Sequence, residues 1–244
     1  MFSELFSLEV FLSSQLAKIL TTKITSTDIR LNMDFFEFKN RISNLKKIEL
    51  PGEAAHNKLA PSIRIQELKK IDFSEKRTNQ AGVMAVFYPK YDETYFVLIL
   101  RKTYKGVHSN QIGFPGGRVE KEDRDLAETA LRETEEEVGI PMEKIEVIRG
   151  LSKLYIPPSN FWVHPFVGIL EETPTLVPQE SEVEDILEVK LEDFLDDNNF
   201  VTRNLSTSYM KNIDVPAFLL NDQVVWGATG MMLGELREML QEIL

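Results

Sequence analysis

Short runs of apolar residues along the chain predict buried strands. Ala81–Tyr88 and Tyr95–Leu100 are mainly apolar and are bounded by turn-forming residues, as is typical of strands covered on both faces. Between them, Pro89–Glu93 is predicted to form a hairpin loop. Ile145–Arg149 and Phe161–Ile169 are two further strand candidates.

Apolar residues at helical spacing predict helices around these strands. Residues 125–138 and 228–243 carry this pattern, and an earlier stretch has it at Phe35, Phe38, Ile42 and Leu45. After that stretch, Pro51-Gly52 is predicted to break the helix and to open a loop that runs through His56, Lys58 and Pro61. Helices and strands are mixed rather than strictly alternating, which predicts an α+β or mixed α/β fold.

The first 32 residues look like an appended segment. Their apolar positions follow a helical spacing: Leu5, Leu8, Leu12, Leu16 and Ile19. Glu4 and Glu9 lie where an export signal would carry positive charge. We expect an amphipathic helix that packs on the rest of the chain or on a second subunit, which leaves a homodimer open. Residues 1–32 are therefore assigned to a helical extension, with Met33 as an alternative start, and residues 33–244 to the main domain, with its core from about residue 51.

Composition and charge narrow the class of protein. Of the 244 residues, 43% are apolar and 27% are charged, which is ordinary for a globular protein. The formal net charge of -11 repels a phosphate backbone, so no nucleic-acid partner is expected. The absence of cysteine excludes thiolate zinc sites and fits a reducing cytoplasm. No apolar run approaches the roughly 18 residues of a membrane-spanning helix, so no membrane partner is expected.

The stretch from Gly116 to Ile140 carries the strongest chemical signal. It is typical of a glycine turn followed by a helix, which Asp123 or Asp125 can cap and which Gly139 ends. A helix advances by about 100° per residue. On this basis the buried stripe is predicted to consist of Ala127, Leu131, Thr134 and Val138.

Three glutamates, Glu133, Glu136 and Glu137, occupy a different arc of the same helix. Carboxylates at this spacing repel one another, so a cation is expected beside them. The adjacent Arg132 is expected to orient or neutralise one of them, and hard oxygen ligands suit Mg²⁺ or Mn²⁺. A solvated acidic face is the alternative for any glutamate-rich helix. The preceding Gly116-Gly117 favours a ligand site, because glycine lets the backbone approach a ligand closely.

These residues resemble the signature of the Nudix hydrolase family, G-x5-E-x7-R-E-U-x-E-E-x-G-U, in which U is an aliphatic residue. Arg132-Glu133, Glu136-Glu137 and Gly139-Ile140 match it position by position, with Thr134 in place of the first aliphatic residue. Arg124 stands where the signature has its first glutamate, so the spacer is one residue longer and the acidic position is expected to fall on Asp123. The resemblance implies a Nudix α/β/α sandwich with an N-terminal helical extension, acting as a pyrophosphohydrolase.

The longer spacer resembles the coenzyme A pyrophosphatase branch of this family. The additional motif of that branch, L-L-T-x-R-[SA]-x3-R-x3-G-x3-F-P-G-G, matches Arg101 and Phe114-Pro115-Gly116-Gly117. Gly106 and Asn110 depart from the motif, and Lys105 is expected to supply the missing positive charge. The resemblance implies a nucleoside diphosphate derivative such as coenzyme A as the small-molecule partner. The implied contacts with it are made by Arg101, Lys105, Gln111, Phe114, Pro115, Gly116 and Gly117.

The resemblance also implies roles in metal binding and proton transfer. Glu133, Glu136 and Glu137, together with the carbonyl of Gly117, would hold Mg²⁺ or Mn²⁺. Either Glu133 or Glu182 would accept the proton of the attacking water. Glu182 lies in the acidic segment 179–184, for which a solvated turn is an equal alternative.

Two other functions stay open, and several residues receive a structural interpretation. The same chemistry could act on ADP-ribose or a dinucleotide, or the domain could sense a nucleotide without catalysis, although all three glutamates are retained. The histidines His56, His108 and His164 are expected to be surface or structural residues. Residues 155–161 are predicted to form a rigid loop beside the cleft. The core, rather than a ligand site, is predicted to contain Trp226, Met231, Met232, Leu236 and Leu240.

Overall fold

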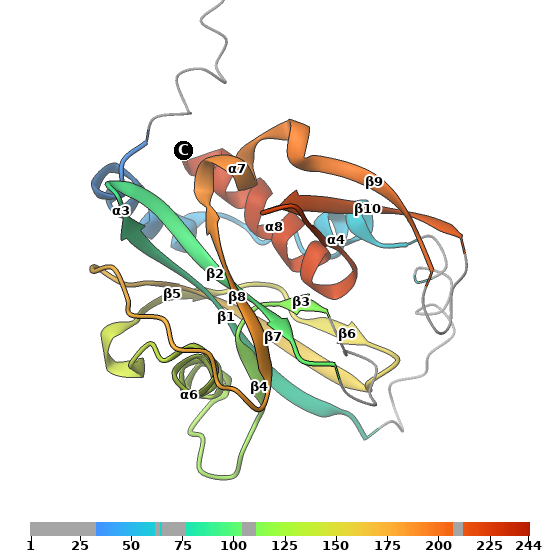
Figure 1. Ribbon diagram of the computed structural model, residues 1–244, viewed down its shortest axis with the longest axis horizontal. Helices are drawn as coiled ribbons and strands as arrows, with labels where there is room; N and C mark the ends of the chain where they lie inside the picture. Colours follow the sequence, from blue (N-terminus) through green and yellow to red (C-terminus); the bar gives the residue numbers. More distant parts are fainter. Residues whose placement is uncertain (1–32, 62–63, 65–76, 104–110, 207–211) are drawn as a thin grey trace, which may run out of the picture. The chain divides into compact units, whose positions relative to one another are not determined.

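The computed structural model describes residues 33–61, 64, 77–103, 111–206 and 212–244. The chain divides into two compact units, and Asp34–Leu244 is the unit described below. The helix expected within residues 1–32 lies outside the described residues. In the described unit, helices and strands are mixed along the chain, as the sequence predicts (Figure 1).

Two sheets contain the strands. The larger sheet has eight strands: β1 Asn79–Lys90, β2 Glu93–Arg101, β3 Ile112–Gly113, β4 Gly116–Arg118, β5 Glu146–Gly150, β6 Leu154–Ile156, β7 Phe161–Ile169 and β8 Val183–Lys190. They follow the order β3-β2-β1-β7-β5, while β4 pairs with β1, β6 with β7 and β8 with β2. The central strands β1 and β7 are parallel, and β1 is antiparallel to β2 and β4. The smaller sheet, in the order β11-β10-β9, contains β9 Phe200–Leu205, β10 Ile213–Leu220 and β11 Gln223–Val225.

Helices lie on both faces of the larger sheet. The helices are α3 Phe35–Ile42, α4 Glu53–Leu59, α6 Leu126–Val138, α7 Leu191–Leu195 and α8 Gly227–Ile243, with 3-10 turns η1 Ser43–Lys47, η2 Met142–Lys144 and η3 Asp197–Asn199. Figure 1 shows α6 on one side of the sheet and α8 with α4 on the other. This is the predicted α/β/α sandwich. None of the described helices is long and apolar enough to span a membrane.

The connection between β1 and β2 is shorter than predicted. Both strands extend into the segment expected to be a loop, and only Tyr91 and Asp92 remain as the turn. Both residues have positive φ angles, 54° and 63°. This conformation is typical of the two-residue turns that match the twist of antiparallel strands. The prediction of a hairpin is confirmed, but the prediction of a five-residue loop is wrong.

The loop predicted after Pro51-Gly52 is also wrong, because this segment contains helix α4. Gly52 precedes the helix with φ 59° and ψ -133°, a conformation that favours glycine. Ala55 and Leu59 are buried where α4 packs on α8. A Cβ atom at Gly234 of α8 would lie 2.2 Å from Cδ1 of Leu59, so this glycine allows the two helices to approach closely.

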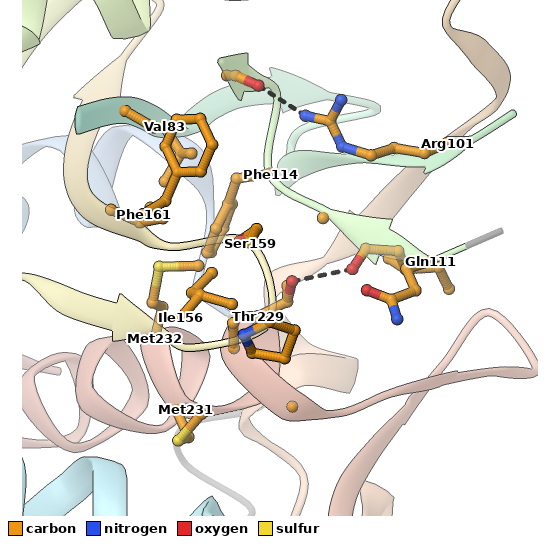
Figure 2. Close-up of a pocket in the computed structure, with 18 of the residues that line it drawn as sticks. Val83, Arg101, Gln111, Phe114, Ile156, Ser159, Phe161, Thr229, Met231 and Met232 are labelled. Atoms are coloured by element: carbon orange, nitrogen blue, oxygen red, sulfur yellow. Dashed lines mark hydrogen bonds between the residues drawn. The ribbon is translucent and has the colours of Figure 1, made fainter. Parts of the chain in front are cut away.

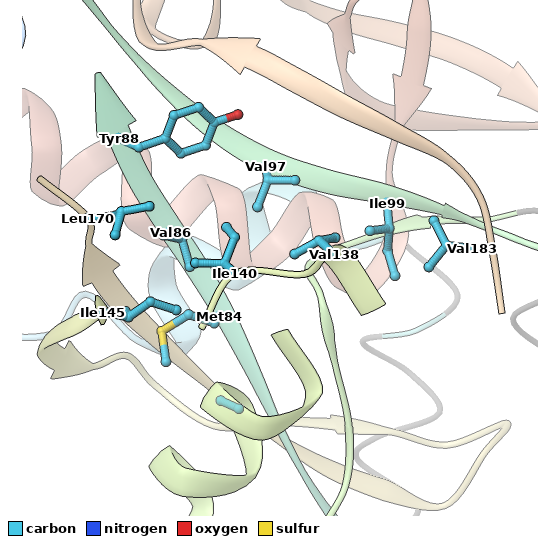
Figure 3. Packing of buried hydrophobic residues seen from close by; sticks show 11 residues of the cluster. Met84, Val86, Tyr88, Val97, Ile99, Val138, Ile140, Ile145, Leu170 and Val183 are labelled. Atoms are coloured by element: carbon cyan, nitrogen blue, oxygen red, sulfur yellow. The ribbon is translucent and has the colours of Figure 1, made fainter. Parts of the chain in front are cut away.

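The core fills both sides of the central sheet. Successive side chains of a strand point to opposite faces, and in β1 both sets are buried. Met84 and Val86 join the cluster shown in Figure 3, which also includes Val138 and Ile140 at the end of α6. On the other face, the ring of Phe87 packs on Phe38 of α3 with 5.0 Å between centroids. The packed core therefore reaches back to α3.

Candidate active site

Helix α6 carries the acidic residues and is fixed at both ends. The Asp125 carboxylate caps its N-terminus by accepting hydrogen bonds from the backbone N–H groups of Ala127 and Glu128, both at 2.9 Å. At the other end, Gly139 adopts a φ angle of 75°, in the left-handed region that favours glycine. The helix predicted for residues 125–138 is thereby confirmed to within one residue.

A glycine in β1 lets α6 lie directly on the sheet. A Cβ atom at Gly82 would come within 2.3 Å of the carbonyl oxygen of Leu126 and within 3.0 Å of the backbone nitrogen of Ala130. A larger residue would therefore push the helix away from the sheet. The contact fixes how far the acidic side chains of α6 lie from β4.

The buried face of α6 differs in part from the predicted stripe. Thr134 and Val138 are buried as predicted, but Ala127 and Leu131 are only half-buried. The hydroxyl of Thr134 donates a hydrogen bond of 2.6 Å to a carbonyl within the helix, which satisfies this polar residue at the aliphatic position. The close contact at Gly82 draws an adjacent part of the helix onto the sheet. The buried residues are Thr129, Ala130, Thr134, Glu137 and Val138.

Glu137 is a buried carboxylate with one oxygen that lacks a hydrogen bond. The residue is 1% exposed, and its Oε2 accepts a 2.8 Å hydrogen bond from the N–H of Gly116. Its Oε1 lies 3.1 Å from Nη1 of Arg101, yet no donor is aligned with it for a hydrogen bond. Burial raises the pKa of Glu137 to about 7, against the opposing charge of Arg101. A buried oxygen without a donor is available to a cation.

Glu133 lies against the glycines of β4. Its side chain is 14% exposed, and burial raises its pKa although the charge of Arg132 opposes the shift. A Cβ atom at Gly117 would lie 2.3 Å from Oε2 of Glu133. The carboxylate therefore occupies space that only glycine leaves open, and two of the predicted metal ligands lie in close contact.

Arg132 joins acidic residues from two segments. Its guanidinium donates hydrogen bonds of 2.9 and 3.1 Å to Asp123, of 3.0 Å to Glu133 and of 3.2 Å to Glu136. The hydrogen bonds from Arg132 are the main cause of the lowered pKa of Asp123. Asp123 is therefore an ion-pair partner of Arg132 rather than a member of the glutamate cluster. The Glu136 side chain is 50% exposed and lies at the rim.

The turn before β8 brings Glu182 close to the same glutamates. Backbone hydrogen bonds hold this turn in place, from the N–H of Gln179 to the carbonyl of Glu137 at 3.0 Å and from the N–H of Lys102 to the carbonyl of Glu182 at 2.8 Å. Burial is the main reason why the pKa values of Glu133 and Glu137 are raised, and the negative charge of Glu182 adds to both shifts. The side chain of Glu182 therefore lies within electrostatic range of both residues.

A cavity of about 300 Å³ is lined in part by Arg101, Gly116 and Gly117, the residues that contact Glu137 and Glu133. In β1, Ala81 and Val83 line it, whereas Gly82 between them faces α6, so the cavity lies on the opposite side of the sheet from that helix. Arg101 contacts both the cavity and the acidic cluster. It lines the cavity, while its Nη2 donates a 2.6 Å hydrogen bond to the carbonyl of Gly116 and its Nη1 faces Glu137. Figure 2 shows this arginine at one end of a largely apolar pocket.

Most residues predicted to bind the substrate lie at this cavity. Its lining includes Arg101, Gln111, Phe114, Gly116 and Gly117. Pro115 does not line it. This proline is buried, and its carbonyl accepts a 2.9 Å hydrogen bond from the N–H of Met84, so it holds β4 against β1 instead. Lys105 and His108 lie outside the described residues.

The prediction that Met231 and Met232 belong to the core is confirmed, because both are buried, whereas Trp226 is only half-buried. Leu236 and Leu240 are fully buried as predicted, but the other three residues line the cavity. The apolar pattern of α8 could not separate a core face from a cavity wall, because both need apolar side chains. The loop predicted for residues 155–161 is shorter than expected, because its ends belong to β6 and β7. The segment lies beside the cavity, as predicted, and contributes Ile156, Ser159 and Phe161 to the same wall.

Two of the three histidines lie within the described residues and are held by protein groups, as predicted. Nε2 of His56 lies 3.1 Å from a carboxylate oxygen of Glu235, and Nε2 of His164 lies 2.9 Å from Oε1 of Gln80. His56 is buried. Both histidines therefore have structural partners.

The glutamates fit a divalent cation by their chemistry but are not gathered into a finished site. Within the described ranges, no three acidic or histidine side chains converge closely enough to hold a metal ion. Arg132 holds Glu133 and Glu136, and Arg101 faces Glu137. The Oε1 atom of Glu137 that lacks a hydrogen bond and the hard oxygen donors of the cluster suit Mg²⁺ or Mn²⁺. The residues therefore fit such an ion once the two arginines release the carboxylates.

Comparison with known proteins adds relatives with the same domain. The NUDIX domain family matches residues 78–208, more than half of the chain. A protein of Pectobacterium atrosepticum named "Uncharacterized Nudix hydrolase NudL" is 33% identical over 129 residues, which is 53% of this chain and 66%, just under two thirds, of the relative. A protein of the same name from Yersinia enterocolitica is 32% identical over 146 residues, covering 60% of this chain and 74% of the relative.

Solved structures include a Nudix hydrolase from M. smegmatis, RenU, which aligns with a TM-score of 0.47 and 13% identity over 68% of this chain and 88% of that one. The family match itself spans α6, the glycines of β4 and the strands that hold them. The family predicted from the signature is confirmed. The chain belongs to the Nudix hydrolase family.

Proposed function

We propose that this protein hydrolyses the phosphoanhydride bond of coenzyme A or an acyl-coenzyme A, releasing 4′-phosphopantetheine or its acyl form and adenosine 3′,5′-bisphosphate. One observation carries this proposal. The buried Glu137, with an oxygen that lacks a hydrogen bond, faces Arg101 at one end of an apolar cavity. A charged diphosphate and a less polar arm on one substrate match these two regions. The motif from Arg101 to Gly117, which resembles that of the coenzyme A branch, supports the same substrate.

The acidic cluster would hold Mg²⁺ or Mn²⁺ through Glu133, Glu136 and Glu137, with the Gly117 carbonyl as a further ligand. Such an ion, when bound, neutralises phosphate oxygens and makes a water molecule more acidic. The Arg132 side chain orients Glu133 through the 3.0 Å hydrogen bond between them.

The Arg101 guanidinium would exchange its contact with Glu137 for the diphosphate. Arginine binds phosphate oxygens through paired hydrogen bonds, and this side chain already lines the cavity. Its movement would release the carboxylate of Glu137 at the same time as it engages the substrate. Lys105, which lies outside the described residues, remains a second proposed phosphate contact.

Glu182 is our proposed acceptor for the proton of the attacking water. The alternative, Glu133, is a proposed metal ligand and accepts a hydrogen bond from Arg132, so its carboxylate is already engaged. The Glu182 carboxylate accepts no such bond from the described part of the chain, and its residue is exposed. A general base of this kind contributes roughly 10² to 10⁴ in rate.

Changing Glu182 to glutamine is therefore expected to lower kcat by about 10²-fold or more without changing the midpoint of unfolding. Glutamine keeps the shape but cannot accept the proton. The matched control is Glu184→Gln, two residues further along the same exposed acidic segment, which should keep full activity. Wild-type kcat in Glu182→Gln would move the role of the base to Glu133.

Changing Gly117 to alanine is expected to reduce activity more than stability. The nearest neighbours of the added Cβ would be the carboxylate atoms at the end of the Glu133 side chain, the closest at 2.3 Å, and that end can move aside. We expect kcat to fall by roughly 10- to 100-fold, because small displacements of catalytic groups have effects of this size, while the melting temperature changes by a few degrees. Gly150→Ala is the control, since its Cβ would meet its nearest neighbour at 3.4 Å. Equal activity of both variants would contradict the placement of Glu133.

A substrate panel tests the proposed function directly. The purified chain is incubated with Mg²⁺ or Mn²⁺ and coenzyme A, 3′-dephospho-coenzyme A, ADP-ribose or a dinucleotide, and the products are separated by chromatography. We expect the coenzyme A forms to be cleaved with the highest kcat/KM. Faster cleavage of ADP-ribose or a dinucleotide would identify that compound as the preferred substrate and leave the proposed type of reaction unchanged. No cleavage of any compound would favour a domain that binds nucleotides without catalysis.

A further inference from the structure

We propose that the apolar cavity binds the pantetheine arm of the substrate, and not its nucleoside, so that this arm determines specificity. This inference rests on the proposed function and names the half of the molecule that the protein recognises. The cavity begins at Arg101, which faces the acidic cluster. In coenzyme A the pantetheine arm and the ribose are both attached directly to the diphosphate, so a diphosphate at this arginine places one of the two at the entrance of the cavity.

The walls of the cavity suit an arm that carries methyl and methylene groups. Val83, Ile156 and Phe161 line the cavity, and Met231 and Met232 come from α8. Figure 2 shows the methionines away from Arg101, beyond Ile156 and Thr229. Methionine side chains are flexible and adapt to irregular apolar ligands. The dimethyl group and methylenes of pantetheine would be buried against these side chains.

The polar groups of the wall are poorly placed to recognise a nucleoside. The hydroxyl of Thr229 donates a 2.9 Å hydrogen bond to the carbonyl of Ile112, and the guanidinium of Arg118 donates one of 3.2 Å to Asn79. Arg101 is engaged by Gly116. A ribose and a purine edge would bring several donors and acceptors into this space, and each polar group buried without a partner is unfavourable. Pantetheine also carries polar groups, but they are separated by methyl and methylene groups that an apolar wall can cover, so the wall favours the arm over the nucleoside.

Ser159 supplies one polar contact of the right kind. Its Oγ is buried and has no hydrogen-bond partner in the part of the chain that the structure describes, and the residue lines the cavity. Buried hydroxyls of native proteins normally have a partner. An amide carbonyl of pantetheine would accept a hydrogen bond from this hydroxyl, while the neighbouring methylenes contact the apolar wall.

The size of the cavity agrees with one half of coenzyme A rather than with the whole molecule. Its volume of about 300 Å³ lies at the lower end of the range for small-molecule sites, roughly 300–1,000 Å³. Coenzyme A as a whole would exceed it. Part of the ligand therefore stays outside, and the charged adenosine 3′,5′-bisphosphate half is the part that water solvates best.

Product inhibition and two cavity variants test this inference. We expect 4′-phosphopantetheine to inhibit cleavage of coenzyme A competitively. Met232→Gln, which introduces a polar group into the apolar wall, should raise the inhibition constant for 4′-phosphopantetheine about tenfold or more and leave that for adenosine 3′,5′-bisphosphate unchanged. Ser159→Ala removes a single hydrogen bond at almost no change in volume, so it should raise the same constant roughly two- to tenfold. Met142→Gln, on the remote turn η2, is the matched control and should change neither constant.

Two results would overturn the inference. One is a larger effect of Met232→Gln on adenosine 3′,5′-bisphosphate than on 4′-phosphopantetheine, which would place the nucleoside in the cavity. The other is unchanged inhibition by both compounds in both cavity variants. If the chain cleaves no coenzyme A, binding of 4′-phosphopantetheine to the same variants by calorimetry decides the matter. Binding that weakens in the variants would keep the inference while the proposed function fails, and absence of binding would end both.

Discussion

Replacement of Glu137 by glutamine is expected to abolish hydrolysis of coenzyme A and to leave the fold intact. Glutamine retains an oxygen that can accept the 2.8 Å hydrogen bond from Gly116, so the packing of α6 against β4 is preserved. It removes the negative charge from a buried carboxylate with an oxygen that lacks a hydrogen-bond donor. A divalent ion held by the cluster depends on that charge. We expect kcat to fall on the order of 10³-fold or more, measured at saturating Mg²⁺.

The control for this prediction lies two residues earlier on the same helix. Glu135 is exposed, and its carboxylate accepts a 2.9 Å hydrogen bond from the N–H of Met142, which glutamine can also accept. Glu135→Gln should therefore keep wild-type turnover. Full activity of Glu137→Gln, with a circular dichroism spectrum like that of the wild type, would show that Glu137 is not a metal ligand.

The acidic helix could be predicted from the sequence because its information is local. Asp125 and Gly139 lie at its two ends, and the spacing of Glu133, Glu136 and Glu137 follows from helix geometry alone. The family signature depends on the same adjacent residues. What the sequence did not indicate is how deeply each glutamate is buried, because that depends on the contact between α6 and Gly82, a residue of a distant strand.

The cavity could be predicted only in part, for the same physical reason. Phe114 and Gly116-Gly117 were found through a local motif, but the wall opposite them comes from α8 and from the loop before β7. Trp226 and the methionines of α8 carry no motif, and their apolar character is shared with core residues. The only sequence signal for this wall was the helical spacing of the apolar residues in α8. Such spacing predicts that one face of the helix is buried, but it does not indicate whether that face covers the core or a cavity.

Helix α4 was predicted as a loop because its stability comes from tertiary contacts. It has seven residues, fewer than an isolated helix needs to be stable in water. It is held in place by packing on α8 and by a buried polar contact. That contact is made by Glu235 of α8, whose carboxylate accepts hydrogen bonds of 3.1 Å from the N–H of Gly52, from the N–H of Ser152 and from the ring of His56.

Replacement of Glu235 by alanine is expected to destabilise the protein strongly. The residue is 0% exposed, and its removal would leave the buried ring of His56 and the part-buried N–H groups of Gly52 and Ser152 without their acceptor. Each buried donor that loses its acceptor costs roughly 1–3 kcal/mol, and more where the acceptor was charged. Because Met231 lies one turn before Glu235 on α8, the cavity wall should be disturbed as well. The free energy of unfolding is measured by urea denaturation, with the m-value as the check that the same transition is observed.

The same interaction predicts how this loss depends on pH. Burial acts to raise the pKa of Glu235, but the hydrogen bonds from His56 and Ser152, together with the charge of His56, outweigh it and the pKa is lowered. The folded protein therefore binds this proton more weakly than the unfolded chain. The stabilisation by Glu235 is complete at pH values above the ordinary pKa of a glutamate carboxyl. It is lost as the pH falls through the lowered pKa that Glu235 has in the folded protein.

We accordingly expect the difference in unfolding free energy between the wild type and Glu235→Ala to be largest near neutral pH and to narrow below about pH 4. Glu238→Ala, one turn or less away on the same helix, is the matched comparison. Its carboxylate is partly exposed and pairs with the exposed Lys58 at 2.9 Å, and a pair of this kind contributes about 0–1 kcal/mol. An equally small loss of stability in both alanine variants at neutral pH would contradict this prediction. It would show that the carboxylate of Glu235 does not hold α8 to α4 and to the segment before β6.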